Sequence, residues 1–311
     1  ISESEFFPKG HGVHTAYLNH VAMLKKLNIE VVTNSLKKAD VVHIETIGPL
    51  GLYKLLTSKK TVVSAHVIPA SFEGSLIGAA YWLGAAKSYL RFFYNKASLV
   101  LAVGPKVKTQ LNEIGVTQKI EIFPNAIDTK VFIPSSDLRE LGKKTLGLKE
   151  NARVIMGVGQ VQIRKGIEDF IKIAQQLPKF TFIWVGNKPF KMLTAKSEEL
   201  QQLLKSPPKN FILAGGVPYL RMPQVYNAAD IFFLPSYQEN ASMAIIEAAS
   251  CGLPLVLRDL AEYQLLYKEG YLNCSNNKEF KENIQGLFSD KKLFEKQSKA
   301  SLLLAQKFSF E

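Results

Sequence analysis

Short apolar runs alternate along this chain with longer stretches in which apolar residues recur every three or four positions. Each run has the length of a strand and ends at Gly, Pro or polar residues, whereas each longer stretch indicates a helix. This alternation predicts parallel sheets with right-handed crossovers, an α/β fold. The expected strands are residues 30–33, 41–45, 61–66, 99–103, 120–123, 154–159, 180–186, 211–216, 231–234 and 253–257. The expected helices are residues 13–27, 51–57, 105–114, 167–176, 222–229 and 243–250, and we expect the chain to be helical after Tyr263.

The length of 311 residues suits two domains of roughly 150 residues each. We place the first domain at residues 1–148 and the second at residues 149–311. Residues 124–128 read as a turn and domain exit, and residues 133–149 are polar and basic, as a linker or hinge would be. The chain begins at Ile1 rather than Met, so we expect a first strand before Ser2 to be cut short.

The stretch around residues 231–257 reads as a strand, a loop, a helix and a second strand. Gly252 ends the helix and Pro254 prevents its restart. Ligands of open parallel sheets bind beyond the carboxyl ends of the strands, where Glu239 lies. Glu247 follows eight residues later, about two helical turns, which would place both carboxylates near one helix face.

Two carboxylates at this edge would accept hydrogen bonds from sugar hydroxyls. The backbone N–H groups of Ala241, Ser242 and Met243 would hold an anion at the start of the helix. Together they describe a nucleotide-sugar site. On spacing alone, the simpler interpretation is favoured, in which Glu239 is a loop charge and Glu247 an exposed helix charge.

Two further stretches have the chemistry of an anion site. Arg164 and Lys165 are adjacent cations before a predicted helix, and they would bind a diphosphate by charge and hydrogen bonds, unless they belong to a solvated turn. Gly10 and Gly12 bracket a loop that opens another helix, although such a pair is often only a turn. His66 ends a predicted strand at the ligand edge, where a histidine is often just a satisfied polar residue.

Residues 71–96 combine aromatic, aliphatic and basic side chains. A helix of this composition can lie in a membrane interface, with aromatic rings among the headgroups and cations on anionic lipid. The alternative is a core helix that covers the sheet. Cations one turn apart favour the interface, because buried helices rarely carry them. The residues assigned to this surface are Phe72, Leu76, Trp82, Lys87, Arg91, Phe92 and Phe93.

The spacing of Glu239, seven residues and Glu247, followed by Gly252-Leu-Pro254, resembles the signature of retaining glycosyltransferases of family 4. The resemblance implies a GT-B fold, two Rossmann-like domains with parallel sheets that face each other across a cleft. One departure is Asn240-Ala241, where many members have Gly-Phe. The second domain would bind the nucleotide sugar, and the first would face the acceptor and the membrane.

The resemblance also implies roles for single residues. Arg164 and Lys165 match the basic pair on the donor diphosphate, His66 matches a histidine that contacts the donor sugar, and the loop of Gly10 and Gly12 approaches the donor phosphate. The expected catalytic set is Arg164, Lys165, His66 and Glu239. The expected donor-binding set is Gly10, Gly12, Arg164, Lys165, Glu239, Asn240, Ala241, Ser242, Met243 and Glu247.

Within that family, three segments resemble bacterial diacylglycerol glucosyltransferases: Ser71-Phe-Glu-Gly-Ser-Leu76, the Lys87-x-x-x-Arg91-Phe-Phe-Tyr94 run, and Arg258-Asp-Leu260. This resemblance implies a monotopic enzyme on the cytoplasmic face of the cell membrane. It would transfer glucose from UDP-glucose to diacylglycerol for glycolipid and lipoteichoic acid anchors. UDP-glucose is then a substrate, and no cofactor is expected.

Composition changes this interpretation in a few respects. The net charge of +12 suggests a polyanion, an anionic phospholipid surface or merely a solubilising surface. The cations are scattered without a recognised motif, so no nucleic acid is expected.

No Asp-x-Asp pair or His/Cys cluster has metal spacing, so no metal is expected and catalysis would be electrostatic. Cys251 and Cys274 form no C-x-x-C pair, which indicates a reducing compartment.

Two alternatives stay open. One is a soluble family 4 transferase that uses another sugar nucleotide and a polysaccharide or small-molecule acceptor, with residues 72–94 in the core. The other is a module that binds a nucleotide sugar without turnover.

Overall fold

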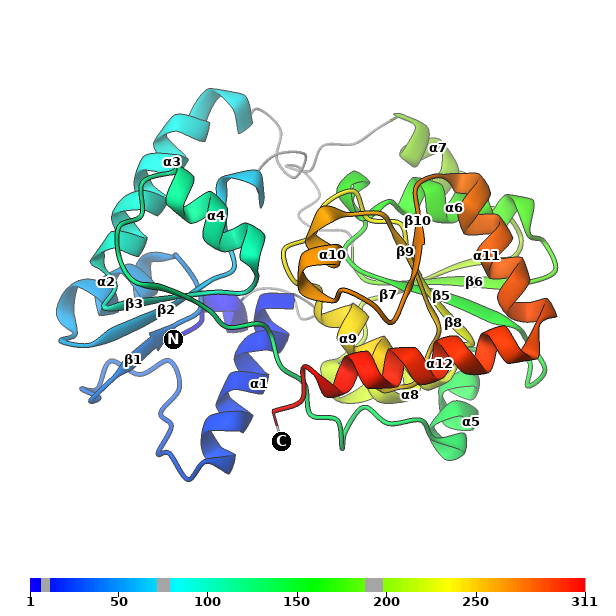
Figure 1. Cartoon of the computed structure of the whole chain (residues 1–311), viewed down its shortest axis with the longest axis horizontal. Coiled ribbons are helices and arrows are strands. Elements are labelled where there is room, and N and C mark those ends of the chain that lie inside the picture. Colours follow the sequence, from blue (N-terminus) through cyan, green and yellow to red (C-terminus); the bar gives the residue numbers. More distant parts are fainter. Residues whose placement is uncertain (7–11, 72–78, 188–197, 311) are drawn as a thin grey trace. The chain divides into compact units, whose positions relative to one another are not determined.

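The computed structural model of the chain describes residues 1–6, 12–71, 79–187 and 198–310 (Figure 1). Contacts divide it into two compact units, Ile1–Ala126 and Ile127–Glu311. Each unit is built on its own sheet, and all strand pairs in both sheets are parallel, as the alternation of strands and helices predicts. The division falls within residues 124–128, so residues 127–148 belong to the second unit rather than to the first.

The first unit has a four-stranded sheet in the order β1-β2-β3-β4. The apolar runs form its strands because Ile44, Val63 and Val100 are wholly buried between sheet and helices. The strands are β1 (Val42–Ile44), β2 (Thr61–Ala65), β3 (Leu99–Ala102) and β4 (Ile120–Ile122). The helices are α1 (Gly12–Lys26), α2 (Pro49–Thr57), α3 (Ala79–Lys96) and α4 (Pro105–Glu113), with 3-10 turns η1 (Glu3–Phe6) and η2 (Pro69–Ser71).

The strand predicted at residues 30–33 is wrong, because this segment is irregular and exposed. Ile1 flanks β1 instead: its ammonium donates to the His43 carbonyl, and the Glu45 N–H donates to the Ile1 carbonyl over 2.8 Å. Ser2 then exchanges two hydrogen bonds with the side-chain amide of Asn34. A side chain rather than a backbone ladder therefore joins this segment to the sheet.

The second unit has a six-stranded sheet in the order β10-β9-β8-β5-β6-β7. Its strands are β5 (Val154–Val158), β6 (Thr181–Val185), β7 (Phe211–Gly215), β8 (Ile231–Leu234), β9 (Leu255–Arg258) and β10 (Leu272–Cys274). Its helices are α5 (Ser136–Thr145), α6 (Ile167–Gln176), α7 (Glu198–Lys205), α8 (Met222–Asn227), α9 (Met243–Ser250), α10 (Ala261–Leu266), α11 (Asn277–Ser289) and α12 (Lys291–Gln306), with 3-10 turns η3 (Ile163–Lys165) and η4 (Tyr219–Arg221).

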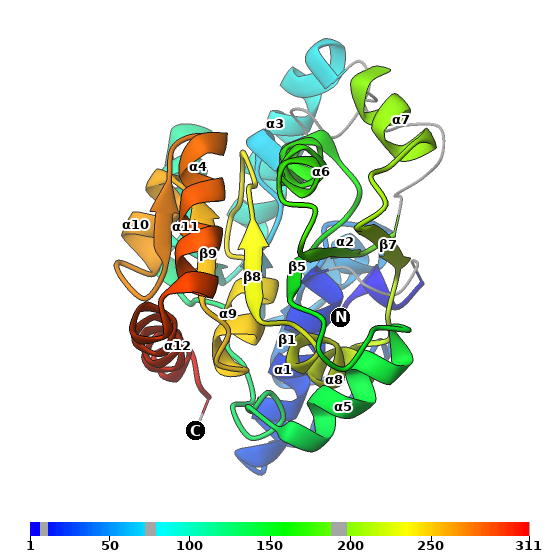
Figure 2. The same ribbon diagram turned by 90° about the vertical axis from the view of Figure 1, so that its right-hand side faces the viewer.

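This strand order is doubly wound. The chain moves outward in one direction from β5 and in the other from β8, so right-handed crossovers place α6 and α9 on opposite faces of the sheet. Figure 2 shows α6 on one side of β5 and β8, with α8 and α9 on the other. The order reverses between β5 and β8, and the crevice beyond their carboxyl ends is the place where such sheets bind ligands.

Buried aromatic rings fix α6 on the sheet. Phe170 of α6 stacks on Phe233 of β8 at a centroid distance of 5.3 Å and meets Trp184 of β6 edge-on at 5.1 Å. The Trp184 indole donates to the Gly159 carbonyl over 2.8 Å. The start of the loop after β5 is thus anchored to the core.

The interpretation of residues 133–149 as a linker or hinge is wrong, because α5 packs against α8. Arg139 donates to the carbonyls of Asn227 and Ala229 and to Asp230. A Cβ at Gly142 would lie 1.9 Å from the Gln224 carbonyl oxygen, so the two helices are in close contact. Arg139 and Lys143 of this segment therefore bind backbone carbonyls inside the unit.

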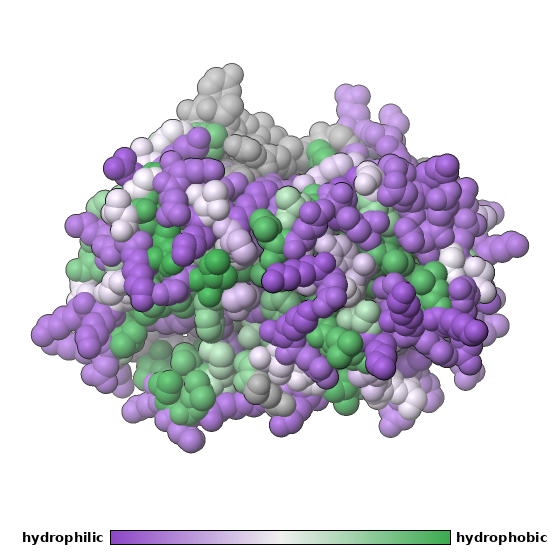
Figure 3. All heavy atoms as spheres, viewed as in Figure 1, coloured by the Kyte–Doolittle hydropathy of each residue, from purple (hydrophilic) through white to green (hydrophobic). Residues whose placement is uncertain are grey.

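The expectation of continuous helix after Tyr263 is also wrong, because β10 intervenes. It is short, and Asn273 is exposed between Leu272 and buried Cys274, so its alternation is brief. Beyond it, α12 exposes Lys291, Lys292, Lys296 and Lys299, and hydrophilic residues dominate the surface over α11 and α12 (Figure 3). Part of the basic charge therefore belongs to a solvated face. Among the described helices, none is long and apolar enough to span a bilayer.

Candidate functional site

Two loops lie together at the switch point of the second sheet. One joins β5 to α6 and the other joins β8 to α9, and the Tyr237 N–H donates to the Arg164 carbonyl over 2.8 Å. Gly166 has φ +71°, and a Cβ there would lie 2.0 Å from the Pro235 carbonyl oxygen. Both facts require glycine, because a side chain would strain this conformation and collide with backbone. The two loops are therefore held in one register.

The predicted residues Lys165 and Glu239 meet in this crevice. The Lys165 Nζ lies 2.5 Å from Glu239 Oε1, and Ser236 donates to the same oxygen over 2.8 Å. Their side chains are only 13% and 6% exposed. Burial lowers the pKa of Lys165, and the charge of Glu239 opposes that effect. The interpretation of Lys165 as a solvated turn charge and of Glu239 as a loop charge is thereby excluded.

Arg164 lies beside this pair in a partly buried position. Its Nε donates to the Gln162 side chain over 2.9 Å, which ties the guanidinium to its own loop. The structure thus brings Arg164, Lys165 and Glu239 to one edge, where they present two cations and one carboxylate.

Glu247 lies within α9, whereas Glu239 precedes that helix by four residues. The expectation that both share one helix face is therefore wrong. Glu247 is 4% exposed, so it is not an exposed helix charge either. Its Oε2 accepts from the Tyr226 hydroxyl over 2.7 Å. Burial raises the pKa of Glu247 to about 7, against the hydrogen bond from Tyr226.

Helix α9 begins and ends where the sequence predicts. Ser242 is its N-cap and makes no side-chain cap hydrogen bond, while Asn240 and Ala241 lie in the preceding loop. At the other end Gly252 has φ +74°, and its N–H and that of Leu253 return to carbonyls of the last turn. The amides of the first turn lie at the same end of the sheet as Glu239.

Sequence reasoning missed a polar cluster behind the two loops, in which Asp169 and most of the Arg258 side chain are buried and Tyr237 is exposed. Asp169 of α6 accepts hydrogen bonds from Arg258 at the end of β9 and from the Tyr237 hydroxyl. The Arg258 guanidinium lies 4.0 Å from the Tyr237 ring centroid and donates to the Pro235 carbonyl over 3.0 Å. Burial and Asp169 raise the pKa of Tyr237 to about 12. Two signals pointed to Arg258: its position at the end of a strand and its place in the Arg258-Asp-Leu260 segment.

A second polar cluster lies in the first unit. His66 directly follows β2 and Glu45 directly follows β1, so both lie at the carboxyl edge of that sheet. Glu45 contacts three imidazole nitrogens: His66 Nε2 at 2.7 Å, His20 Nδ1 at 2.7 Å and His43 Nε2 at 3.3 Å. Only His66 was predicted. The rule that selected His66, a polar residue where a strand ends, would also have selected Glu45.

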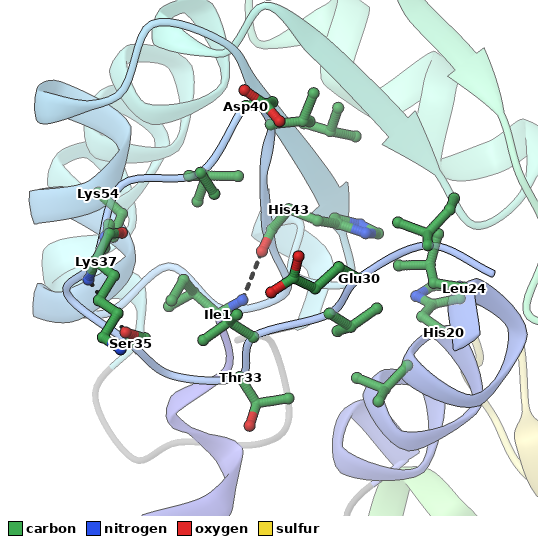
Figure 4. A pocket seen from close by; sticks show the side chains of 18 of the residues that line it. Ile1, His20, Leu24, Glu30, Thr33, Ser35, Lys37, Asp40, His43 and Lys54 are labelled. Carbon is green, nitrogen blue, oxygen red and sulfur yellow. Dashed lines mark hydrogen bonds between the residues drawn. The ribbon is translucent and has the colours of Figure 1, made fainter.

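This cluster borders a pocket of about 610 Å³ that is lined by α1, β1 and the segment around residues 29–41. Figure 4 shows the His43 ring directed from β1 toward His20 of α1, and the two rings stack at 5.4 Å. Burial lowers the pKa of His43 to about 4, although Glu45 acts in the opposite sense. Burial acts to raise the pKa of Glu45, but the three imidazoles outweigh it and hold that pKa well below its usual range.

Only part of the membrane surface that the sequence predicts on α3 is exposed in the structure. Lys87, Arg91 and Phe92 are exposed, with Phe92 at 42%, but Phe93 is wholly buried. Assigning Phe93 to that surface is therefore wrong, because it packs against the rings of Tyr89 and Tyr94 in the core. Gly12 is the first residue of α1. Gly10, Phe72, Leu76 and the Trp82 side chain lie outside the described residues.

A family model described as glycosyl transferases group 1 matches residues 139–302, and one described as glycosyltransferase family 4 matches residues 6–131. An α-galactosylglucosyldiacylglycerol synthase from Streptococcus pneumoniae is 36% identical over 283 residues, 88% of this chain and 76% of the relative. The chain belongs to the group 1 glycosyl transferases. It is also 28% identical over 290 residues to a processive diacylglycerol α-glucosyltransferase from Acholeplasma laidlawii, 91% of this chain and 86% of that one.

Solved structures agree on the fold of this glycosyl transferase. A sucrose-phosphate synthase from Thermosynechococcus elongatus has a TM-score of 0.72 at 17% identity, over 97% of this chain and 76% of that one. HepE from Anabaena in complex with UDP-glucose has a TM-score of 0.72 at 19% identity, over 87% and 75%. The GT-B fold class predicted from the sequence is confirmed.

Proposed function

We propose that this glycosyl transferase moves glucose from UDP-glucose to diacylglycerol, as a peripheral enzyme on the cytoplasmic face of a membrane. The observation that carries the proposal is the likeness to two glycolipid synthases, which spans 88% and 91% of the chain and therefore both units. Similarity confined to the second unit would support only a shared type of sugar donor. Because the similarity also covers the first unit, it supports a shared type of acceptor as well.

The second unit supplies the donor chemistry. Arg164 and Lys165 would stabilise the negative charge that develops on the leaving diphosphate, in a crevice where burial strengthens electrostatic interactions. Glu239 would accept hydrogen bonds from the sugar and Glu247 from the ribose, with the first-turn amides of α9 directed at phosphate. The names of both relatives specify α-linked products, and UDP-glucose is itself α-linked, so the proposed reaction retains configuration. In the proposed step the acceptor hydroxyl attacks from the face that the diphosphate leaves, and the departing phosphate takes the hydroxyl proton, so no side-chain nucleophile is needed.

The first unit supplies the lipid-facing surface. Lys87 and Arg91 lie one turn apart on α3 with Phe92 exposed beside them, a combination that suits an anionic interface. Between α3 and α4 lies a hollow of about 440 Å³, and the charged residues of its lining are Lys87, Arg91 and Glu113. Cations around a hollow at this surface would attract phospholipid headgroups.

A second candidate is transfer of galactose to glucosyldiacylglycerol. The name of the 36% identical relative describes a product that carries both sugars, and this observation favours it. The site chemistry is common to both candidates, because glucose and galactose differ in the orientation of one hydroxyl.

The deciding experiment is a two-by-two assay with radiolabelled UDP-glucose or UDP-galactose and vesicles that contain diacylglycerol or glucosyldiacylglycerol. Label from UDP-glucose in diacylglycerol, increased by anionic phospholipid, is the expected result. Label only from UDP-galactose in glucosyldiacylglycerol would establish the second candidate. Free sugar without lipid label would keep the donor and reject the acceptor, and binding without turnover would leave a nucleotide-sugar module. We expect EDTA to leave the rate unchanged.

The membrane part is tested by Lys87→Glu with Arg91→Glu. We expect vesicle binding to fall by at least about 30-fold, since each cation near an anionic surface contributes about 1 kcal/mol. Hydrolysis of the soluble donor should persist. The matched control is Lys292→Glu with Lys296→Glu, two exposed lysines four residues apart on α12. If both double variants lose vesicle binding equally, the loss is due to the change in net charge and not to the position of Lys87 and Arg91.

A further inference from the structure

Two neighbouring residues of the loop between β8 and α9 contact the groups that are proposed to bind the donor. Ser236 donates to Glu239 Oε1 over 2.8 Å, and that oxygen also lies 2.5 Å from Lys165 Nζ. The Tyr237 N–H donates to the Arg164 carbonyl over 2.8 Å. The positions of the carboxylate and of both cations therefore depend on where these two loop residues lie.

One guanidinium holds this stretch of the loop from the end of β9. Arg258 Nε donates to the Pro235 carbonyl over 3.0 Å, and Nη2 donates to Asp169 of α6. The same carboxylate oxygen accepts from the Tyr237 hydroxyl, and the guanidinium lies 4.0 Å from the centroid of the Tyr237 ring. Arg258 thus contacts the residue on either side of Ser236.

This cluster is largely shielded from water. The side chains of Arg258 and Asp169 are 12% and 9% exposed, and the wholly buried Phe280 ring has its centroid 5.2 Å from the guanidinium. Asn277, at the start of α11, donates to the second oxygen of Asp169 over 3.0 Å. A planar guanidinium fixes the directions of two hydrogen bonds at once, which an ammonium cannot do. The shape of Arg258 should therefore matter as well as its charge.

We propose that Arg258 is a positioning residue: by holding the loop between β8 and α9 against α6, it sets the geometry in which Lys165 and Glu239 meet. It thereby acts on the stabilisation of charge at the leaving diphosphate. A displacement of about 1 Å at a reacting group costs about 100-fold in rate, so an indirect contact has a measurable effect. The proposal rests on the proposed function for the identity of the leaving group.

The first test is the kinetics of Arg258→Lys with UDP-glucose. Lysine keeps the charge beside Asp169 but lacks the fork that also reaches the Pro235 carbonyl. We expect kcat to fall about 10- to 100-fold with the donor KM within about threefold of the parent, because the affected interaction is made in the transition state. The control is Arg153→Lys, which alters an exposed guanidinium that lies on the Phe288 ring, and it should behave as the parent.

The second test is a double-mutant cycle between Arg258 and Lys165. If Arg258 acts through Lys165, its substitution should cost little once the ammonium is absent. Arg258→Lys combined with Lys165→Met should then keep a kcat within about threefold of that of Lys165→Met alone. The full loss in both backgrounds would show that Arg258 does not act through Lys165, and the proposal would be overturned.

Tyr237→Ala keeps the proposal testable if Arg258→Lys does not fold. The Tyr237 ring is 52% exposed, so its removal leaves no internal cavity. We expect kcat to fall about three- to tenfold with an unchanged donor KM, because the guanidinium no longer holds the loop through this ring. A kcat equal to that of the parent would overturn the proposal.

The outcomes separate this proposal from the proposed function. If the parent hydrolyses the donor but moves no hexose to lipid, the proposed acceptor is wrong, and the cycle measured on hydrolysis still decides the role of Arg258. If the parent does neither, the proposed function fails and calorimetry with UDP decides. A loss of affinity in Arg258→Lys that disappears in the Lys165→Met background would support the positioning role, and an unchanged affinity would overturn it. If Arg258→Lys lowers only the folded fraction and leaves the rate per folded molecule unchanged, Arg258 supports folding alone, which also overturns it.

Discussion

Glu45 in the first unit and Glu239 in the second are both buried at the carboxyl edge of a parallel sheet, and their partners differ. Glu239 meets the ammonium of Lys165 and the hydroxyl of Ser236. Glu45 meets three imidazoles. An ammonium keeps its charge through the physiological range, whereas an imidazole changes protonation within it. The carboxyl edge of the second sheet therefore keeps a permanent charge, whereas that of the first sheet holds imidazole protons at defined nitrogens.

The difference extends to neighbouring groups. Burial lowers the pKa of His43 to about 4 in the first unit and raises the pKa of Glu247 to about 7 in the second. Both shifts have one cause, the loss of water around the charged form, and each keeps its group neutral over part of the range below pH 7. The two edges thus respond to acid in opposite directions.

The largest effect is expected when the permanent positive charge at the carboxyl edge of the second sheet is removed. Lys165→Met removes a cation from the leaving-group site, and kcat/KM for the donor should fall by about 10²- to 10³-fold. The control is Lys172→Met, which removes an ion pair between Lys172 of α6 and Glu199 of α7. A kcat/KM for Lys165→Met within about threefold of the parent would remove Lys165 from the mechanism.

The same variant leaves Glu239 buried without its cation, which costs about 3–5 kcal/mol of stability at similar sites. Lys165→Met combined with Glu239→Gln should restore the melting temperature without restoring the rate. Recovery of both would show that the pair supports only the fold.

A smaller effect is expected at Glu247, whose carboxyl joins α9 to Tyr226. Glu247→Gln keeps a hydrogen-bonding group for Tyr226 but removes the charge, so the donor KM should rise about tenfold, about 1.4 kcal/mol. Steady-state kinetics against donor concentration measure it. An unchanged KM would contradict the assignment of Glu247 to the ribose hydroxyls.

The last expected effect, comparable in size, is that the two units change stability in opposite directions when the pH falls. His43 has a lowered pKa, so its contribution to stability is present above its ordinary value of 6.5 and is lost as pH falls toward about 4. Glu247 has a raised pKa, so its contribution is present below its ordinary value of 4.5 and is lost as pH rises toward about 7. Acidification from pH 7 to 5 should weaken protection around β1 and strengthen it around α9, each by about 1–2 kcal/mol.

Hydrogen exchange, corrected for the intrinsic effect of pH, follows both segments in one sample. His43→Asn should flatten the response of β1 and leave that of α9, and Glu247→Gln should do the reverse. Parallel responses of the two segments in the parent would refute the contrast.

The second unit follows from its sequence more closely than the first, for local reasons. The apolar run of β8 ends at Pro235, α9 ends at Gly252, and α6 begins after Gly166, so nearby residues set each boundary. Lys165 and Glu239 follow strands that are neighbours on either side of the switch point of the sheet. Their encounter was therefore predictable once the strand order was assumed.

The errors have non-local causes. Residues 30–33 have a strand-like sequence, but their link to the sheet is the Asn34 side chain rather than a ladder. The cations of α5 resemble those of a hinge, yet Arg139 binds carbonyls that lie far along the chain. The histidine cluster draws on α1, β1 and β2, so no spacing reveals it.

The glycine contact between the two donor loops bears on how this enzyme could change during evolution. The Pro235 carbonyl can lie against residue 166 only because glycine has no Cβ, and the hydrogen bond from the Tyr237 amide fixes the relative register of the two segments. An insertion in either loop would shift one partner past the other. New sugar preferences should therefore arise by exchange of side chains at constant loop length, while loops that are not tied in this way remain open to insertion.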